Sequence, residues 1–231
     1  MNDSIETRYK IIRERILKAA LGAGRDPDSI RLVAVSKTQP AGFMRQAANA
    51  GADIFGENYI QEARDKFNTL ADLPLQWHFI GHLQSNKAKY AVRMFDLIHT
   101  VDSVKLANEL NKQAGKAGKV QNILIQVNIS GETTKSGTTE KAVLGLIEQV
   151  LDLPFLSVRG LMTMPPFFDA PDRARPFFTA LRNLRDRLQT AFAGKVSLKE
   201  LSMGMTGDFE AAIEEGATLV RIGTALFGTR Q

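Results

Sequence analysis

A lysine closes the first apolar run of the sequence, and its amine could do covalent chemistry. Lys37 stands in the segment RLVAVSKTQP, whose apolar residues are typical of a buried strand. Side chains alternate along a strand, so Lys37 shares a face with Val33 and Val35. One interpretation is a solvated lysine at a strand end, because lysine is seldom fully buried. The other is a nucleophile that forms a Schiff base with the carbonyl group of a ligand.

Two glycine-rich segments near the C-terminus, ELSMGMTGDFEAAI and TLVRIGTALFG, could bind a phosphate group. Glycine lets the backbone approach a phosphate closely, and hydroxyls and the first N–H groups of a helix can donate to it. Alternatively, the glycines only ease the turns between strands and helices. Together with a strand-end lysine, the two segments favour a phosphorylated aldehyde such as pyridoxal 5'-phosphate (PLP). The residues concerned are Gly204, Gly207, Gly223, Ser202, Thr206 and Thr224.

Arg221 lies two residues before Gly223 and therefore on the same strand face. It could pair with a carboxylate of a neighbouring helix. It could also face the nitrogen of a pyridine ring held between the lysine and the phosphate site. A guanidinium does not give up its proton, so it would keep that nitrogen unprotonated and weaken the ring as an electron sink. This arrangement disfavours chemistry that needs a strong sink, such as transamination.

Two further groups of polar residues follow predicted strands. Asn58, in the segment FGENYIQEA, could hydrogen-bond a ligand or cap the next helix. The three histidines His78, His82 and His99 raise the possibility of a metal site. Their spacing matches no known ligand pattern, so we expect packing or supporting roles and no metal.

The order of apolar runs and amphipathic stretches predicts the fold. Eight runs, expected as strands, alternate with helix-like stretches, and an amphipathic helix with Asp3 or Ser4 as its N-cap precedes the first run. This pattern predicts an α/β fold, a single (β/α)₈ TIM barrel over residues 1–231 with an extra N-terminal helix. The active site of such a barrel lies at the C-terminal ends of its strands. The runs cover residues 31–37, 52–58, 77–83, 96–102, 122–130, 156–164, 200–205 and 218–228.

Composition limits the location and partners of the protein. The sequence has no cysteine, which excludes disulfides and thiolate chemistry and favours the cytoplasm. It contains no continuous apolar run of about 18 residues, so we expect no membrane insertion. The net charge of +5 comes from 30 basic and 25 acidic residues interleaved along the chain, which is typical of a solvated surface.

An arginine-rich segment, RARPFFTALRNLRDRLQ, is a rival feature that could bind nucleic acid. Its arginines Arg175, Arg182 and Arg185 share a helix face. The opposite face carries the apolar stripe of an ordinary barrel helix, so we favour a solvated face and no nucleic-acid partner. The stripe consists of Phe177, Phe178, Leu181, Leu184 and Leu188.

The assembled motifs resemble the YggS/PROSC family of pyridoxal phosphate homeostasis proteins, which is related to the N-terminal barrel of alanine racemase. The resemblance runs over nearly the whole chain through VAVSKTQP, FGENYIQEA, WHFIGHLQSNK, IHTVDS, QVNIS, GLMTM, LSMGM and VRIGTALFG. It implies PLP as cofactor, with Lys37 as the Schiff-base lysine and Arg221 facing the pyridine nitrogen. The other residues implied to contact the cofactor are Asn58, Ser202, Gly223 and Thr224, together with Met203 and His78.

The resemblance also implies a role. A PLP-binding protein of this kind controls cofactor supply and amino-acid metabolism, with apo forms of PLP-dependent enzymes as possible recipients. The alternative is a PLP-dependent amino-acid racemase of low activity. Alanine racemase uses a second base, a tyrosine, together with a β-domain that this chain lacks, so the resemblance favours a monomeric carrier without turnover. Only Tyr59, of the tyrosines Tyr9, Tyr59 and Tyr90, is near a predicted strand end.

Overall fold

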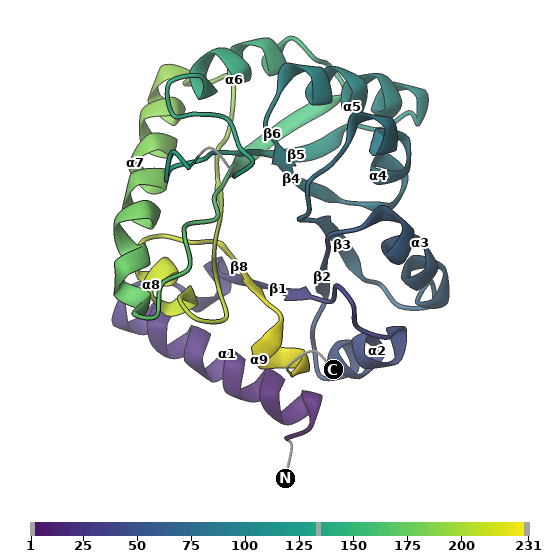
Figure 1. The fold of residues 1–231 in the computed structure, drawn as a ribbon, viewed down its shortest axis with the longest axis vertical. Coiled ribbons are helices and arrows are strands. Elements are labelled where there is room, and N and C mark those ends of the chain that lie inside the picture. Colours follow the sequence, from purple (N-terminus) through teal and green to yellow (C-terminus); the bar gives the residue numbers. More distant parts are fainter. Residues whose placement is uncertain (1–2, 133–134, 229–231) are drawn as a thin grey trace.

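The apolar runs form a closed barrel in the computed structural model, which describes residues 3–132 and 135–228. All neighbouring strands are parallel, and β8 pairs with β1 to close the ring (Figure 1). Each strand coincides with a predicted run, so the predicted TIM barrel is confirmed. Residues 1–2, 133–134 and 229–231 of the predicted domain lie outside the described residues. The strands are β1 Arg31–Val35, β2 Ile54–Glu57, β3 Gln76–Phe79, β4 Leu97–Val101, β5 Gln121–Gln126, β6 Leu156–Met162, β7 Glu200–Met205 and β8 Leu219–Ile222.

The helices form a ring outside the strands (Figure 1). One difference from the sequence prediction is that Thr224–Phe227, expected within the last apolar run, forms the short helix α9 after β8. The helices are α1 Ile5–Gly22, α2 Ala41–Asn49, α3 Ile60–Thr69, α4 Ala88–Met94, α5 Val104–Lys116, α6 Val143–Leu151, α7 Arg175–Ala191, α8 Phe209–Glu214 and α9. Short 3₁₀ turns are η1 Pro27–Ser29, η2 Ser85–Lys87 and η3 Pro171–Ala174.

The N-terminal helix α1 precedes the first strand, as predicted. Ser4 is its N-cap, and its hydroxyl accepts a hydrogen bond from the N–H of Thr7 at 3.1 Å. The face carrying Ile12 and Ile16 is buried, and the helix packs against α2, α8 and α9 on one side of the barrel (Figure 1). It therefore supports the strands and helices at the closure of the ring.

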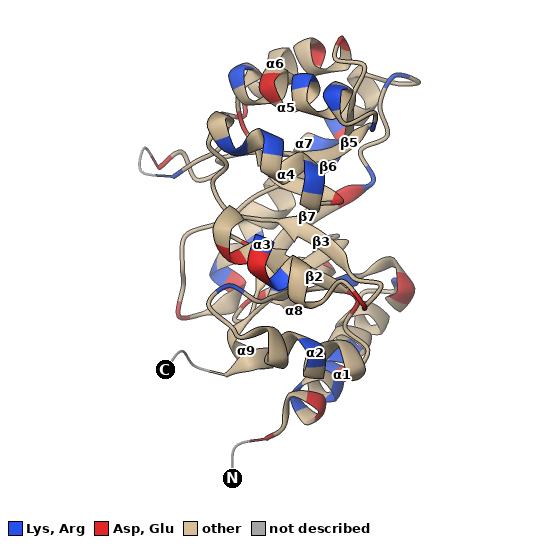
Figure 2. Cartoon of the chain, turned by 90° about the vertical axis from the view of Figure 1, so that its right-hand side faces the viewer, with Lys and Arg blue, Asp and Glu red and all other residues tan. Residues whose placement is uncertain are grey.

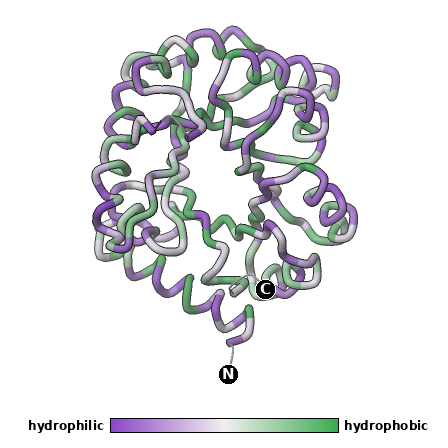
Figure 3. Tube along the Cα trace, viewed as in Figure 1, coloured by the Kyte–Doolittle hydropathy of each residue, from purple (hydrophilic) through white to green (hydrophobic). Residues whose placement is uncertain are grey.

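The core has two layers that follow from the alternation of strand side chains. Residues facing outward pack with the helices in a large apolar cluster. Inward-facing residues form a smaller apolar cluster inside the barrel, and Figure 3 shows hydrophobic segments along the central strands. This inner cluster fills the barrel below the strand ends and leaves the C-terminal ends for polar groups. It consists of Val33, Ile54, Leu97, Leu124, Met162 and Leu219.

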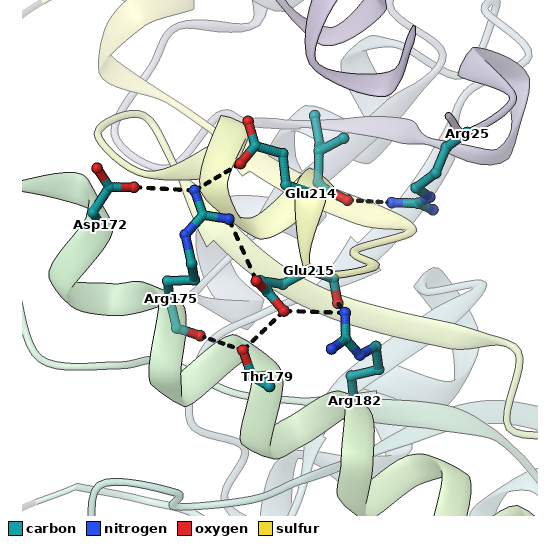
Figure 4. Close-up of polar contacts among 8 residues, drawn as sticks. Arg25, Asp172, Arg175, Thr179, Arg182, Glu214 and Glu215 are labelled. Atoms are coloured by element: carbon teal, nitrogen blue, oxygen red, sulfur yellow. Dashed lines mark hydrogen bonds and ion pairs between the residues drawn. The ribbon is translucent and has the colours of Figure 1, made fainter. Parts of the chain in front are cut away.

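Basic and acidic residues are interspersed over the helices that face the viewer in Figure 2. Arg175 contacts Glu214 at 2.6 Å, and Arg182 contacts Glu215 at 3.0 Å, so both arginines join α7 to α8 (Figure 4). These carboxylates raise the pKa of Arg175. Two of the arginines considered for nucleic-acid binding are thus engaged in holding neighbouring helices together.

The predicted apolar stripe of α7 is buried, with one exception. Phe178, Leu181, Leu184 and Leu188 are buried, whereas Phe177 is half-buried and stacks on Phe168 at a centroid distance of 5.7 Å. No helix in the part of the chain that the structure describes is long and apolar enough to span a bilayer.

Truncating the α7 stripe should destabilise the barrel. Phe178 is 0% exposed, so Phe178→Ala leaves a cavity and should lower the free energy of unfolding by about 3–5 kcal/mol. Phe167→Ala is the matched control, because Phe167 is 85% exposed and its loss should cost less than about 0.5 kcal/mol. Urea unfolding measures both values. Equal effects of the two variants would contradict the packing described for α7.

Candidate cofactor site

A cavity of about 310 Å³ opens at the C-terminal ends of the strands. Its walls come from the segments after β1, β2, β7 and β8, and from the loop between β6 and η3. Chain segments far apart in sequence therefore meet at the place where this barrel architecture builds its sites. The lining residues are Val35, Lys37, Gln39, Asn58, Ile80, Met164, Phe167, Phe168, Met205, Thr206, Gly207, Asp208, Arg221, Gly223, Thr224 and Gly228.

Lys37 lies on the cavity wall where the alternation of β1 predicts it. Val33 belongs to the inner apolar cluster, and Val35 and Lys37 line the cavity above it. The Lys37 side chain is half-buried, and the backbone next to it is unusual, since Thr38 has a φ of 64°. Lys37 therefore lies at the wall of a cavity with both polar and apolar lining residues.

The guanidinium of Arg221 lies at the inner end of the cavity and is only 4% exposed. It donates to the hydroxyl of Ser202 at 2.6 Å and to the carbonyl oxygen of Thr163 at 2.9 Å. Burial lowers the pKa of Arg221 to about 10, which leaves it protonated at neutral pH. No carboxylate of the described residues lies within ion-pair distance of it, so the anticipated pairing with a helix carboxylate is not observed. A buried cation of this kind favours an acceptor or anionic ligand in the cavity.

Ser202 and His78 are buried and are not among the described residues that line the cavity, so their expected contact with the cofactor stays a prediction. The Ser202 hydroxyl is 2.9 Å from Nδ1 of His99, and Nε2 of His99 is 3.0 Å from Nδ1 of His78. All three side chains are buried inside the barrel, so they form a hydrogen-bonded chain that begins at Arg221. Met203 belongs to the apolar cluster between barrel and helices, and its expected contact with the cofactor likewise stays a prediction.

The segments after the neighbouring strands β7 and β8 both line the cavity. Thr206 and Gly207 follow β7, and Gly223 and Thr224 follow β8. A Cβ at Gly223 would lie 3.3 Å from the carbonyl oxygen of Val35, so a larger residue would crowd this wall. The helical hydrogen bonds of α9 begin at Leu226 N, which leaves the preceding N–H groups for a ligand. This side of the cavity has the donor chemistry of a phosphate site.

Asn58 supplies a polar group that the protein does not satisfy. Its Oδ1 is buried and has no hydrogen-bond partner within the described residues. It does not cap the next helix, because α3 has Tyr59 as its N-cap without a side-chain hydrogen bond. A Cβ at Gly81 would lie 2.2 Å from the carbonyl oxygen of Asn58, so Gly81 permits their close approach. The ligand-binding interpretation of Asn58 fits this geometry better than the capping one.

Comparison with known proteins decides the family of the chain. The family model for the alanine racemase N-terminal domain matches residues 9–231. The chain belongs to this family. Its relatives include the pyridoxal phosphate homeostasis proteins of Aquifex aeolicus (strain VF5), 48% identical over 97% of both chains, and of Escherichia coli (strain K12), 44% identical over 100% of this chain and 98% of the relative.

Solved structures agree with this assignment. The structure of PipY from Synechococcus elongatus PCC7942, with PLP bound, is 40% identical and covers 94% of this chain and 100% of that one, with a TM-score of 0.83. Alanine racemase from Corynebacterium glutamicum is 17% identical, with a TM-score of 0.70 over 96% of this chain and 61% of that chain, and shows the shared fold alone.

This member of the alanine racemase N-terminal domain family has an apolar wall that the sequence prediction did not anticipate. Met164, Phe167 and Phe168 line the cavity from the segment between β6 and η3. The sequence signal that could have indicated this wall is the pair of aromatic residues, Phe167 and Phe168, in a proline-containing segment. Elsewhere, no group of three or more acidic or histidine side chains is placed to hold a metal ion, as far as the described residues go.

The buried histidines should make stability depend on pH. Burial lowers the pKa of His78 to about 3, and burial with the neighbouring His78 and Arg221 holds the pKa of His99 well below its usual value. Both stay neutral in the folded protein as pH falls below about 6.5, whereas the unfolded chain takes up protons. The free energy of unfolding should therefore fall by about 1.4 kcal/mol per pH unit for each histidine.

Urea unfolding between pH 7 and pH 5 measures this slope. His78→Gln should reduce the slope of unfolding free energy against pH by the contribution of one histidine. The control His82→Gln, at an exposed position, should leave the slope unchanged. An unaltered slope in His78→Gln would contradict a neutral, buried His78.

Proposed function

We propose that this protein binds PLP in the cavity at the strand ends, holds it as a Schiff base on Lys37, and serves PLP homeostasis. One observation carries the proposal: Lys37 and the buried, charged Arg221 line the same cavity of about 310 Å³. The names of its relatives and the PLP bound to PipY support this assignment.

The residues of the cavity fit the groups of PLP. Bound PLP supplies an aldehyde that condenses with an amine and a pyridine ring that withdraws electrons. Lys37 supplies the amine, and Arg221 offers a guanidinium to the ring nitrogen from the inner end of the cavity. Thr206, Thr224 and the N–H groups before Leu226 donate to the phosphate. Thr206 adds a hydroxyl to the one expected of Ser202, whose oxygen accepts a hydrogen bond from Arg221.

A carrier fits this site better than a racemase. The described residues that line the cavity include no tyrosine, and Tyr59 is 60% exposed outside it. The candidate bases among the described lining residues are Lys37 and Asp208, and an oxygen of Asp208 already accepts the N–H of Met205 at 2.6 Å. Racemisation needs two bases, one on each face of the ring. Arg221 also keeps the ring nitrogen unprotonated, which weakens stabilisation of a carbanion. We therefore propose that the protein holds PLP and passes it to apo forms of PLP-dependent enzymes.

We also propose a cellular location and an oligomeric state for the protein. The cysteine-free sequence supports a cytoplasmic protein. We propose that it acts as a monomer.

Replacing Lys37 should abolish covalent attachment of PLP. The wild-type protein should gain a visible absorption band with PLP, and borohydride should fix the cofactor to Lys37, as read by peptide mass spectrometry. Lys37→Ala should show neither, because no amine remains at that wall. Lys10→Ala is the control, since Lys10 is an exposed lysine on α1.

Two outcomes would contradict the proposal. A wild-type protein without the band would leave the cavity as a site for another phosphorylated ligand. Sustained amino-acid racemisation that disappears in Lys37→Ala, with no transfer of PLP to any apo-enzyme, would replace the carrier with the racemase.

A further inference from the structure

A buried cluster of charged residues lies under the end of β1, outside the cavity lining. Glu57, at the end of β2, is 0% exposed, and Lys66 of α3 is 7% exposed. Lys66 Nζ lies 2.7 Å from an oxygen of Glu57 and 2.5 Å from an oxygen of Glu62. One buried amine thus joins two carboxylates from successive elements.

This cluster bonds the backbone on both sides of Lys37. Lys66 donates to the carbonyl oxygen of Ser36 at 2.6 Å, and the Ser36 hydroxyl donates to Glu57 at 2.6 Å. On the other side, the N–H of Thr38 donates to Glu62 at 2.5 Å. The residues flanking the proposed Schiff-base lysine are therefore each held by a charged group.

The backbone conformation of Thr38 is unfavourable by itself and requires stabilising contacts. Its φ of 64° lies in the left-handed region, which a β-branched residue adopts only where its surroundings impose it. The hydrogen bond to Glu62 engages the N–H of this residue. It supplies one of the constraints that fix the turn after Lys37.

Burying these charged groups carries a desolvation cost, so stability alone does not account for the cluster. Burial raises the pKa of Glu57, against the opposing effect of Lys66, and Glu57 Oε2 has no hydrogen-bond partner among the residues described. Buried ion pairs are often no more stabilising than apolar residues of the same size. The cluster bonds the residues before and after Lys37, and this geometry is suited to positioning the lysine.

We propose that Glu57, Lys66 and Glu62 are positioning residues that fix the backbone of Ser36 and Thr38, so that the Lys37 amine is presented to an aldehyde in the cavity. This inference rests on the proposed function. It predicts that the cluster contributes to the covalent step and not to the noncovalent contacts of the phosphate or the ring.

Two ligands separate these contributions. PLP forms the Schiff base, whereas pyridoxine 5'-phosphate carries an alcohol in place of the aldehyde and binds only through noncovalent contacts. Glu62→Ala should weaken PLP about tenfold, as expected from losing a hydrogen bond to a charged group, and leave pyridoxine 5'-phosphate unchanged within about twofold. Glu62→Gln keeps an acceptor oxygen and should bind PLP within about threefold of wild type.

A matched control and a second variant test whether the effect of Glu62→Ala comes from the charged cluster. Asp65→Ala removes a carboxylate from the same helix whose side chain is 77% exposed, and should bind both ligands as wild type does. Lys66→Met combined with Glu57→Gln removes both fully buried charges and leaves only the Glu62 carboxylate, which is 25% exposed, without its lysine partner. This double variant should weaken PLP selectively as Glu62→Ala does. Amide exchange in the ligand-free protein should be faster at Thr38 in Glu62→Ala but unchanged in Asp65→Ala.

The outcomes distinguish the inference from the proposed function. Wild-type protein that forms no borohydride-fixed adduct would overturn the proposed function itself. If the wild type forms the adduct and Glu62→Ala forms it with equal affinity, or loses both ligands equally, the positioning role is overturned.

Discussion

A permanently charged guanidinium buried in the barrel sets the conditions for the rest of the site. Arg221 is 4% exposed and donates to one hydroxyl and one carbonyl, and the Asp208 carboxylate opposes the lowering of its pKa by burial. Both histidines below it are kept neutral, because burial and nearby positive charge disfavour their protonation. The inner end of the cavity is consequently a cation, and a ligand that accepts a hydrogen bond or carries negative charge relieves its desolvation.

The barrel makes this arrangement possible by dividing its interior into an apolar and a polar layer. The inner apolar cluster fills the space below, and the polar side chains stand above it, towards the C-terminal ends of the strands. The register between β7 and β8 shifts between the Ser202 and Met205 pairs, since three residues of β7 span two of β8. Such an irregularity re-aims side chains. It lets Ser202 support Arg221 from within the barrel while Met205 and Thr206 line the cavity.

This shift also marks where prediction from sequence reaches its limit. Alternation along single strands places Lys37, Arg221 and Gly223 on the cavity, because each depends only on its own strand. The cavity position of Met205 depends on a shift between two strands, which alternation alone does not encode. Alternation itself puts Ser202 and Met203 on opposite faces of β7, and Met203 lies in the outer apolar cluster. The pairing of His78 with His99 joins β3 to β4 and needs the register of the closed ring. Helix α9 was not predicted, because its residues, TALF, continue the apolar run that was expected to form the last strand.

Two walls of the cavity differ in local stability. On the β1 side, Lys37 stands between backbone groups that bond to Glu57, Lys66 and Glu62. On the wall formed by the segment after β6, Met164 and Phe167 are 43% and 85% exposed, whereas Phe168 is half-buried and stacks on Phe177. The exposed residues of this wall have fewer packing contacts than the bonded, buried cluster on the β1 side, and regions with few buried contacts have the lower local stability. The more stable wall is therefore the one that carries Lys37.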